Sequence, residues 1–149
     1  MTDVWFYHLE STSLEQALPD LLEKVAGRGW RAYVHGLEDD TITALESHLW
    51  TYSATSFLAH GRETNAFADR QPILLGTSGT MVNAPQVYLS VAPVMPPAFD
   101  GLERALIVFE GRDDDHLGWA RAQWKTMKAE GRSLAYWKQN DLGRWEKMQ

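Results

Sequence analysis

The feature that most constrains the fold is an alternation of strand-like and helix-like segments in the amino-terminal third of the chain. Val4 to Leu9 is a compact run of aromatic and β-branched residues, which is typical of a strand. Residues 14–26 repeat apolar side chains at helical spacing, and Arg31 to His35 form a second strand-like run. Residues 38–49 begin with three acids and predict a second helix, since acidic side chains are favourable near a helix amino terminus. This β-α-β-α order predicts parallel strands joined by right-handed crossovers.

The rest of the chain continues the same class of fold. The regular pattern fades from Ser53 to Arg70, and further strands are expected at residues 72–75, 86–91, 105–109 and 134–137. A final long helix is expected to open at residues 113–115 and run to about Glu130, with Gly131 placed to end it. We therefore expect one domain, residues 1–149, built as a three-layer α/β/α sandwich around a mostly parallel sheet of about five strands.

Composition narrows the functional class. The sequence has no cysteine, which excludes disulfides, thiolate zinc sites and cysteine nucleophiles. Apolar residues make up 44% and charged residues 23%, ordinary values for a folded protein. The first residues carry Asp3, His8 and Glu10, a pattern that fits neither a signal peptide nor a membrane helix, so no membrane contact and a cytoplasmic location are expected.

Charge is distributed unevenly along the chain. The net charge is −6, which argues against a protein whose main task is to grip a nucleic-acid backbone. Residues 1–118 contain 17 acids and 7 bases, for a net −10, while residues 119–149 contain 3 acids and 7 bases, for a net +4. The carboxyl-terminal fifth is therefore a basic island in an acidic protein.

That island contains a basic stripe, which we define as Arg121, Lys125, Lys128 and Arg132. Their spacing of 4, 3 and 4 predicts one narrow face of the last helix, with Trp124 at its edge. The simplest interpretation is a solvated basic face helped by the helix dipole. A functional stripe would suit an acidic peptide with an aromatic anchor, or single-stranded nucleic acid, since indole stacks on bases. The acidic remainder of the chain favours the peptide.

Two aromatic residues stand out where the second expected helix ends. Trp50 and Phe57 lie in a stretch that is unusually aromatic for a connection. Core packing is the commoner explanation for such residues. A half-exposed pair beside the basic helix would instead form an anchor pocket.

Enzyme chemistry has little support. No GxGxxG or Walker-type loop is present, and the GTSGT sequence at residues 76–80 lacks the lysine of a phosphate loop, so a flexible turn is expected there. The five histidines show no metal-ligand spacing, and no GxSxG motif frames a serine. We expect no catalytic site, no metal and no cofactor.

Four motifs in a constant order resemble the chi subunits of DNA polymerase III. They are FYHL at 6–9, LW at 49–50 followed by SFLAHG at 56–61, QPILL at 71–75 and ARAQWKTMKAEG at 120–131. The resemblance implies a Rossmann-like fold without nucleotide chemistry, and an adaptor for DNA replication with no active site of its own. Any polymerase activity would belong to the holoenzyme.

The resemblance also implies partners and site residues. The family binds the acidic carboxyl-terminal tail of single-stranded-DNA-binding protein, whose last residue is a phenylalanine, and so meets single-stranded DNA mainly indirectly. By position, Trp50 and Phe57 would line the pocket for that phenylalanine, and Arg121 would receive its carboxylate. Trp124, where relatives often have tyrosine, would border the site. Lys125 and Lys128 would meet the tail's aspartates, Lys128 standing where arginine is common.

The family's second partner is psi, which bridges to the clamp loader. No motif assigns the psi surface here. Residues 142–149 extend beyond shorter relatives and could cover the sheet or contact a partner. Two alternatives remain open, namely direct binding of single-stranded nucleic acid and, from strand order alone, a nucleotide-binding α/β enzyme.

Overall fold

The computed structural model describes residues 2–52 and 58–149 of the chain. In the described residues the elements follow one another along the chain as β1 (Asp3–Leu9), α1 (Leu14–Gly27), β2 (Ala32–His35), α2 (Asp39–Thr51), β3 (His60–Arg62), the short 3-10 helix η1 (Ala68–Arg70), β4 (Ile73–Gly76), β5 (Val87–Ser90), β6 (Arg104–Glu110), α3 (Asp114–Ala129), β7 (Leu134–Gln139) and β8 (Trp145–Lys147). No helix in this part of the chain is long and apolar enough to span a membrane.

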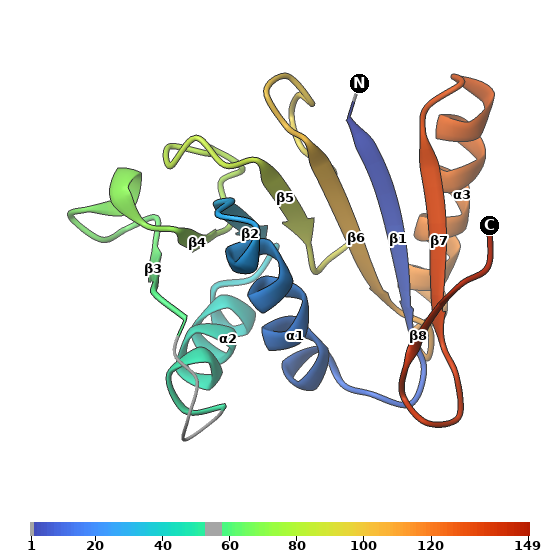
Figure 1. Cartoon of the computed structure of the whole chain (residues 1–149), viewed down its shortest axis with the longest axis horizontal. Helices are drawn as coiled ribbons and strands as arrows, with labels where there is room; N and C mark the ends of the chain where they lie inside the picture. The colour runs from blue at the N-terminus through green and yellow to red at the C-terminus, as the bar shows by residue number, and fades with distance from the viewer. Residues whose placement is uncertain (1, 53–57) are drawn as a thin grey trace.

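The described strands form one eight-stranded sheet in the order β3-β4-β2-β5-β6-β1-β7-β8 (Figure 1). Every neighbouring pair is parallel except β7 and β8, which are antiparallel. The expected α/β class and mostly parallel sheet are confirmed, but the expected number of about five strands was too low. The missed strands, β3 and β8, are three residues each and lie at the two edges of the sheet. Their sequences carry no strand pattern of their own. They become strands through backbone pairing with β4 and β7.

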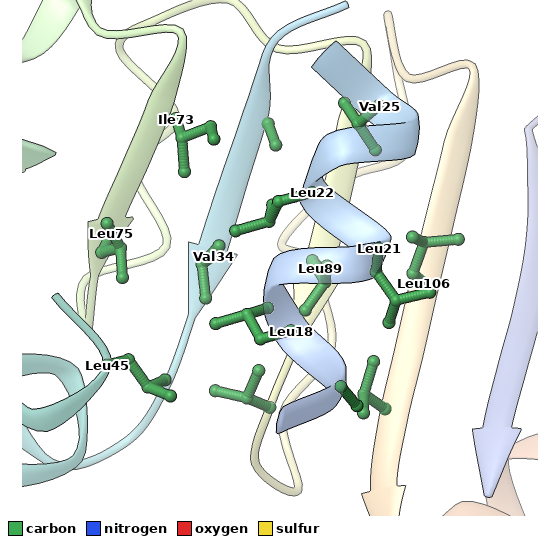
Figure 2. Close-up of a cluster of buried hydrophobic side chains, with 14 of the residues drawn as sticks. Leu18, Leu21, Leu22, Val25, Val34, Leu45, Ile73, Leu75, Leu89 and Leu106 are labelled. Atoms are coloured by element: carbon green, nitrogen blue, oxygen red, sulfur yellow. The ribbon is translucent and has the colours of Figure 1, made fainter. Parts of the chain in front are cut away.

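The helices cover opposite faces of the sheet and complete the three layers. In Figure 1, α1 and α2 lie in front of the sheet and α3 lies behind it. The front core is mainly aliphatic: Leu18, Leu21, Leu22 and Val25 of α1 pack against strands β2, β4, β5 and β6, as Figure 2 shows. The helix starts where the pattern indicated, because Ser13 and Gln16 form a capping box.

Alternate residues of each strand enter different cores. In β1, Phe6 belongs to the core under α3, whereas Tyr7 belongs to the core on the α1 face. In β7, Tyr136 packs on the α3 face and Trp137 on the α1 face. Because side chains alternate with a period of two, neighbouring aromatic residues of one strand line two different surfaces.

The last helix has the expected limits. Asp113 is its amino-terminal cap and accepts hydrogen bonds from the backbone amides of Asp115 and His116. The helix ends at Ala129, and Gly131 follows with φ = 74°, a left-handed conformation that suits glycine after a helix.

Candidate functional site

A groove of about 660 Å³ lies along α3 on the back of the sheet. Its lining comes from α3, β6, β7 and the last residue of the chain, and consists of Phe109, Gly118, Ala120, Arg121, Ala122, Trp124, Lys125, Tyr136 and Gln149. This volume falls in the range of ordinary ligand sites. The groove therefore has room for a side chain or a short peptide segment.

The groove has an aromatic wall. Trp124 packs edge-on against Phe6 of β1 and Tyr136 of β7, with ring centroids 5.4 Å and 5.7 Å apart. The hydroxyl of Tyr136 is 2.6 Å from Nδ1 of His8, which holds the ring in place. Gly118 and Ala122 lie on the same helix and carry little side-chain volume. The groove is thus bounded by rigid rings and remains open where α3 has small residues.

Two cations border this wall. Arg121 and Lys125 line the groove and are exposed. Across residues 2–52 and 58–149, no carboxylate lies within 4 Å of the charged groups of Arg121, Lys125 or Lys128. These charges are therefore free to meet an external anion.

The positive charge of Arg121 also affects the pKa values of two residues at the aromatic wall, His8 and Tyr136. Burial lowers the pKa of His8, and the positive charges of Lys138 and Arg121 lower it further, whereas Glu10 opposes them. Burial raises the pKa of Tyr136, while Arg121 lowers it. The groove therefore presents the neutral phenol of Tyr136 near exposed cations at pH 7, and the neutral imidazole of His8 is buried behind that ring.

Three of the proposed site residues come together here. Arg121, Trp124 and Lys125 line the groove, while Lys128 lies one turn farther along α3, exposed and outside the lining. Arg132 was expected on the basic face of the last helix, but it does not lie there because the helix ends at Ala129. Arg132 lies beyond that end, 3.5 Å from Glu130 and stacked at 4.4 Å over the ring of Phe99. The basic stripe on the helix therefore consists of three residues.

The structure does not bring Trp50 to this groove, which corrects the expectation of one shared pocket. Trp50 lies near the end of α2, is 56% exposed and packs on His60 of β3 at 4.5 Å. Trp124 packs on β1, and β4, β2, β5 and β6 separate β3 from β1. Five strand spacings amount to about 24 Å along the sheet, and the helices lie on opposite faces. Phe57 lies outside the described residues.

Sequence reasoning missed the strand residues of the groove. Phe109 and Tyr136 come from β6 and β7, whose neighbourhood depends on sheet order. The available signal was the pair Gly118 and Ala122, which are spaced by one helical turn beside Arg121. Small residues at that spacing indicate a place where the surface of a helix leaves room for a groove.

The GTSGT turn is not free, in contrast to the expected flexible turn. The carboxylate of Glu63 accepts hydrogen bonds from the backbone amide and hydroxyl of Ser78, at 3.2 Å and 2.9 Å, and from the hydroxyl of Tyr33 at 2.5 Å. The carboxylate of Glu63 therefore already occupies these donors, which a bound anion would otherwise need. In the described part of the chain, no group of three or more His, Cys, Asp or Glu side chains could hold a metal ion.

The family model described as DNA polymerase III chi subunit, HolC, matches residues 1–135. The chain belongs to the DNA polymerase III chi subunit family. A comparison with curated proteins found no match. The chi family is a non-catalytic accessory subunit of DNA polymerase III. The match includes all of α3 and ends within β7, so Arg121, Trp124 and Lys125 lie inside it, whereas Tyr136 and Gln149 lie beyond it.

Proposed function

We propose that this chi-family protein is a replication adaptor whose α3 groove binds the acidic carboxyl-terminal tail of single-stranded-DNA-binding protein. Through psi it would link that protein to the clamp loader. The observation that carries the proposal is the pairing of unpartnered cations with an aromatic wall in one groove. Membership of the chi family supports the replication role.

The chemistry of the groove matches such a tail. The guanidinium of Arg121 would donate charge-assisted hydrogen bonds to the terminal carboxylate, and it can do so with two parallel bonds. The terminal phenyl ring would pack against Trp124 and Tyr136, and this contact would bury apolar surface of the peptide and of the groove. Lys125 and Lys128 would meet aspartates along α3. Because these contacts are exposed, affinity should fall as salt rises.

The test is fluorescence anisotropy of a labelled acidic peptide ending in Asp-Ile-Pro-Phe. Arg121→Ala should weaken binding by about 2 kcal/mol, close to thirtyfold, because the carboxylate loses its charged partner. Arg70→Ala is the matched control. Arg70 is an exposed arginine of η1 stacked on Phe67, away from α3, and this change should leave the affinity within about twofold.

A second variant tests the shape of the groove without changing its charge. Ala122 is exposed and lines the groove, so Ala122→Leu would fill the groove without entering the core. Peptide affinity should drop about tenfold while the thermal midpoint stays within a few degrees. Saturable binding by wild type that neither Arg121→Ala nor Ala122→Leu changes would place the peptide elsewhere. An absence of binding by wild type would overturn the proposal.

A further inference from the structure

A second hollow lies on the opposite face of the sheet, between α1 and the strands β1, β7 and β8. It consists of two depressions of about 330 Å³ and 370 Å³ that share Lys24, Trp137 and Trp145. We call the two together the α1 trough. In Figure 1, α1 lies in front of β2 and β5, and no helix of residues 2–52 and 58–149 lies in front of β1 and β7. The trough occupies this uncovered strip of the sheet.

The floor of the trough is a row of aromatic rings. Trp5 of β1 and Trp137 of β7 have ring centroids 5.5 Å apart. Tyr7 lies parallel to Trp137 at 6.1 Å and edge-on to Trp145 of β8 at 4.9 Å. All three tryptophans are only partly buried. Strand alternation turns these residues to the α1 face, so the rings belong to a different surface from the groove beside α3.

Basic side chains line the trough beside these rings. Lys24 and Arg28, four residues apart, form one edge, and Arg144 lines the far end. Arg104 lies 3.9 Å over the ring of Trp5, and Arg28 lies 4.9 Å over the ring of Trp30. These contacts orient both guanidinium groups while leaving their hydrogen-bond donors available.

These cations form no close ion pairs among the described residues, although Asp3 and Glu103 are near enough to Arg104 to oppose the lowering of its pKa by burial. Among the residues that the structure describes, no carboxylate lies within 4 Å of the charged groups of Lys24, Arg28, Arg104 or Arg144. The lining, as far as the chain is described, contains those four cations and a single acid, Asp20. The trough is therefore basic even though the chain carries a net charge of −6. It is complementary to a ligand with repeated negative charges.

We propose that the α1 trough binds a short single-stranded nucleic acid directly. Indole rings stack on bases of any sequence while arginine and lysine follow the phosphates, and this trough has a row of each. A peptide tail offers one aromatic anchor, whereas here rings and cations repeat along the hollow as bases and phosphates repeat along a strand. The 14 residues of α1 span about 21 Å, enough for a few nucleotides.

Fluorescence anisotropy of a labelled oligothymidylate of about ten nucleotides, at about 50 mM salt, tests the proposal. Arg28→Glu should weaken binding about tenfold and make the slope of log K against log salt shallower by about 0.7 for each phosphate that no longer has a cationic partner. Arg28 is exposed at the end of α1, so the fold should survive. Arg70→Glu changes net charge by the same amount at an exposed residue outside the lining of the trough, and it should leave affinity within about twofold.

Two further measurements distinguish stacking from charge attraction. Four of the seven tryptophans line the trough, so the oligonucleotide should quench intrinsic fluorescence. A duplex of the same sequence should bind at least about tenfold more weakly, because its bases cannot stack on the rings. Equal affinity for duplex and single strand would contradict the proposal.

Competition separates the trough from the groove beside α3. Excess acidic peptide should not displace the oligonucleotide, since the two sites lie on opposite faces of the sheet. No oligonucleotide binding at low salt would overturn the proposal. So would loss of binding in Lys125→Glu together with normal binding in Arg28→Glu, because that result would place the nucleic acid on α3.

Discussion

At the scale of single residues, the buried side chain of His35 has a hydrogen-bond partner for each of its two ring nitrogens. Nδ1 of His35 lies 2.6 Å from the hydroxyl of Tyr88, and Nε2 lies 3.3 Å from the carbonyl oxygen of Thr77. A neutral imidazole with its proton on Nε2 satisfies both contacts, because the tyrosine donates to Nδ1 and Nε2 donates to the carbonyl. Burial lowers the pKa of His35, and it does the same for His8 and His116.

These three histidines predict how stability depends on pH. Their pKa values in the folded state lie below the ordinary value near 6.5, so the unfolded chain binds more protons at mildly acidic pH. The free energy of unfolding should be highest above about pH 6.5 and fall as pH drops below it. Urea titrations at about pH 7.5 and pH 5.5 would show this.

His35→Gln provides the control for that prediction. Glutamine removes the titrating group while keeping polar atoms in the site, so this variant should be less stable at pH 7.5 and lose less stability on acidification than wild type. Equal unfolding free energy at the two pH values in wild type would contradict the assignment of neutral buried histidines.

At the scale of elements, α3 presents the groove, and its amino terminus has a specific cap. The side chain of Asp113 accepts hydrogen bonds from the amides of Asp115 and His116, at 3.0 Å and 3.2 Å. Asp114 lies in the first turn, and the cap contacts there belong to Asp113. Both carboxylates are favourable beside the helix dipole, but only the cap satisfies backbone donors.

This difference gives a matched pair of substitutions. Asp113→Ala should lower the free energy of unfolding by about 1 kcal/mol, the usual cost of losing a cap. Asp114→Ala should cost only a few tenths of a kcal/mol, because it removes only a dipole interaction. Chemical denaturation of both variants measures the difference. Equal costs would mean that the cap of Asp113 adds nothing to the dipole interaction that both carboxylates make.

Elements also differ in how well local sequence indicates them. The bounds of α1 and α3 follow from caps, glycines and helical periodicity. Each of these signals lies within a few residues of the helix end that it marks. β3 and β8 have the sequences HGR and WEK, which contain no apolar alternation. Each becomes a strand because a neighbouring strand offers its free edge, and this depends on tertiary structure.

At the scale of the whole molecule, the sheet separates aromatic and basic features that are similar in sequence. The groove beside α3 lies on one face and the α1 trough on the other, although Tyr136 and Trp137 are adjacent in β7. Trp50 is remote from α3, five strand spacings away along the sheet. Trp50 and Trp124, which the sequence suggested as parts of one site, thus lie on different surfaces, and the aromatic residues of the α1 trough form a third surface.

The separation predicts a negative result. Trp50→Ala should leave the affinity for the acidic peptide within about twofold of wild type, because sites this far apart act independently. Trp124→Ala should weaken the same affinity about tenfold by removing the aromatic wall of the groove. Peptide anisotropy with both variants makes the comparison. A loss in Trp50→Ala equal to that in Arg121→Ala would require a peptide that reaches both surfaces.

The sequence by itself determined the α/β class, the last helix and the grouping of Arg121, Trp124 and Lys125, because these depend on contacts within one or two helical turns. Only the tertiary structure decided that the sheet has eight strands in the described residues, that Tyr136 borders the groove and that Trp50 does not. These outcomes depend on strand order and on the face toward which each residue points. Both are set by pairing between segments far apart in the chain, which local spacing does not encode.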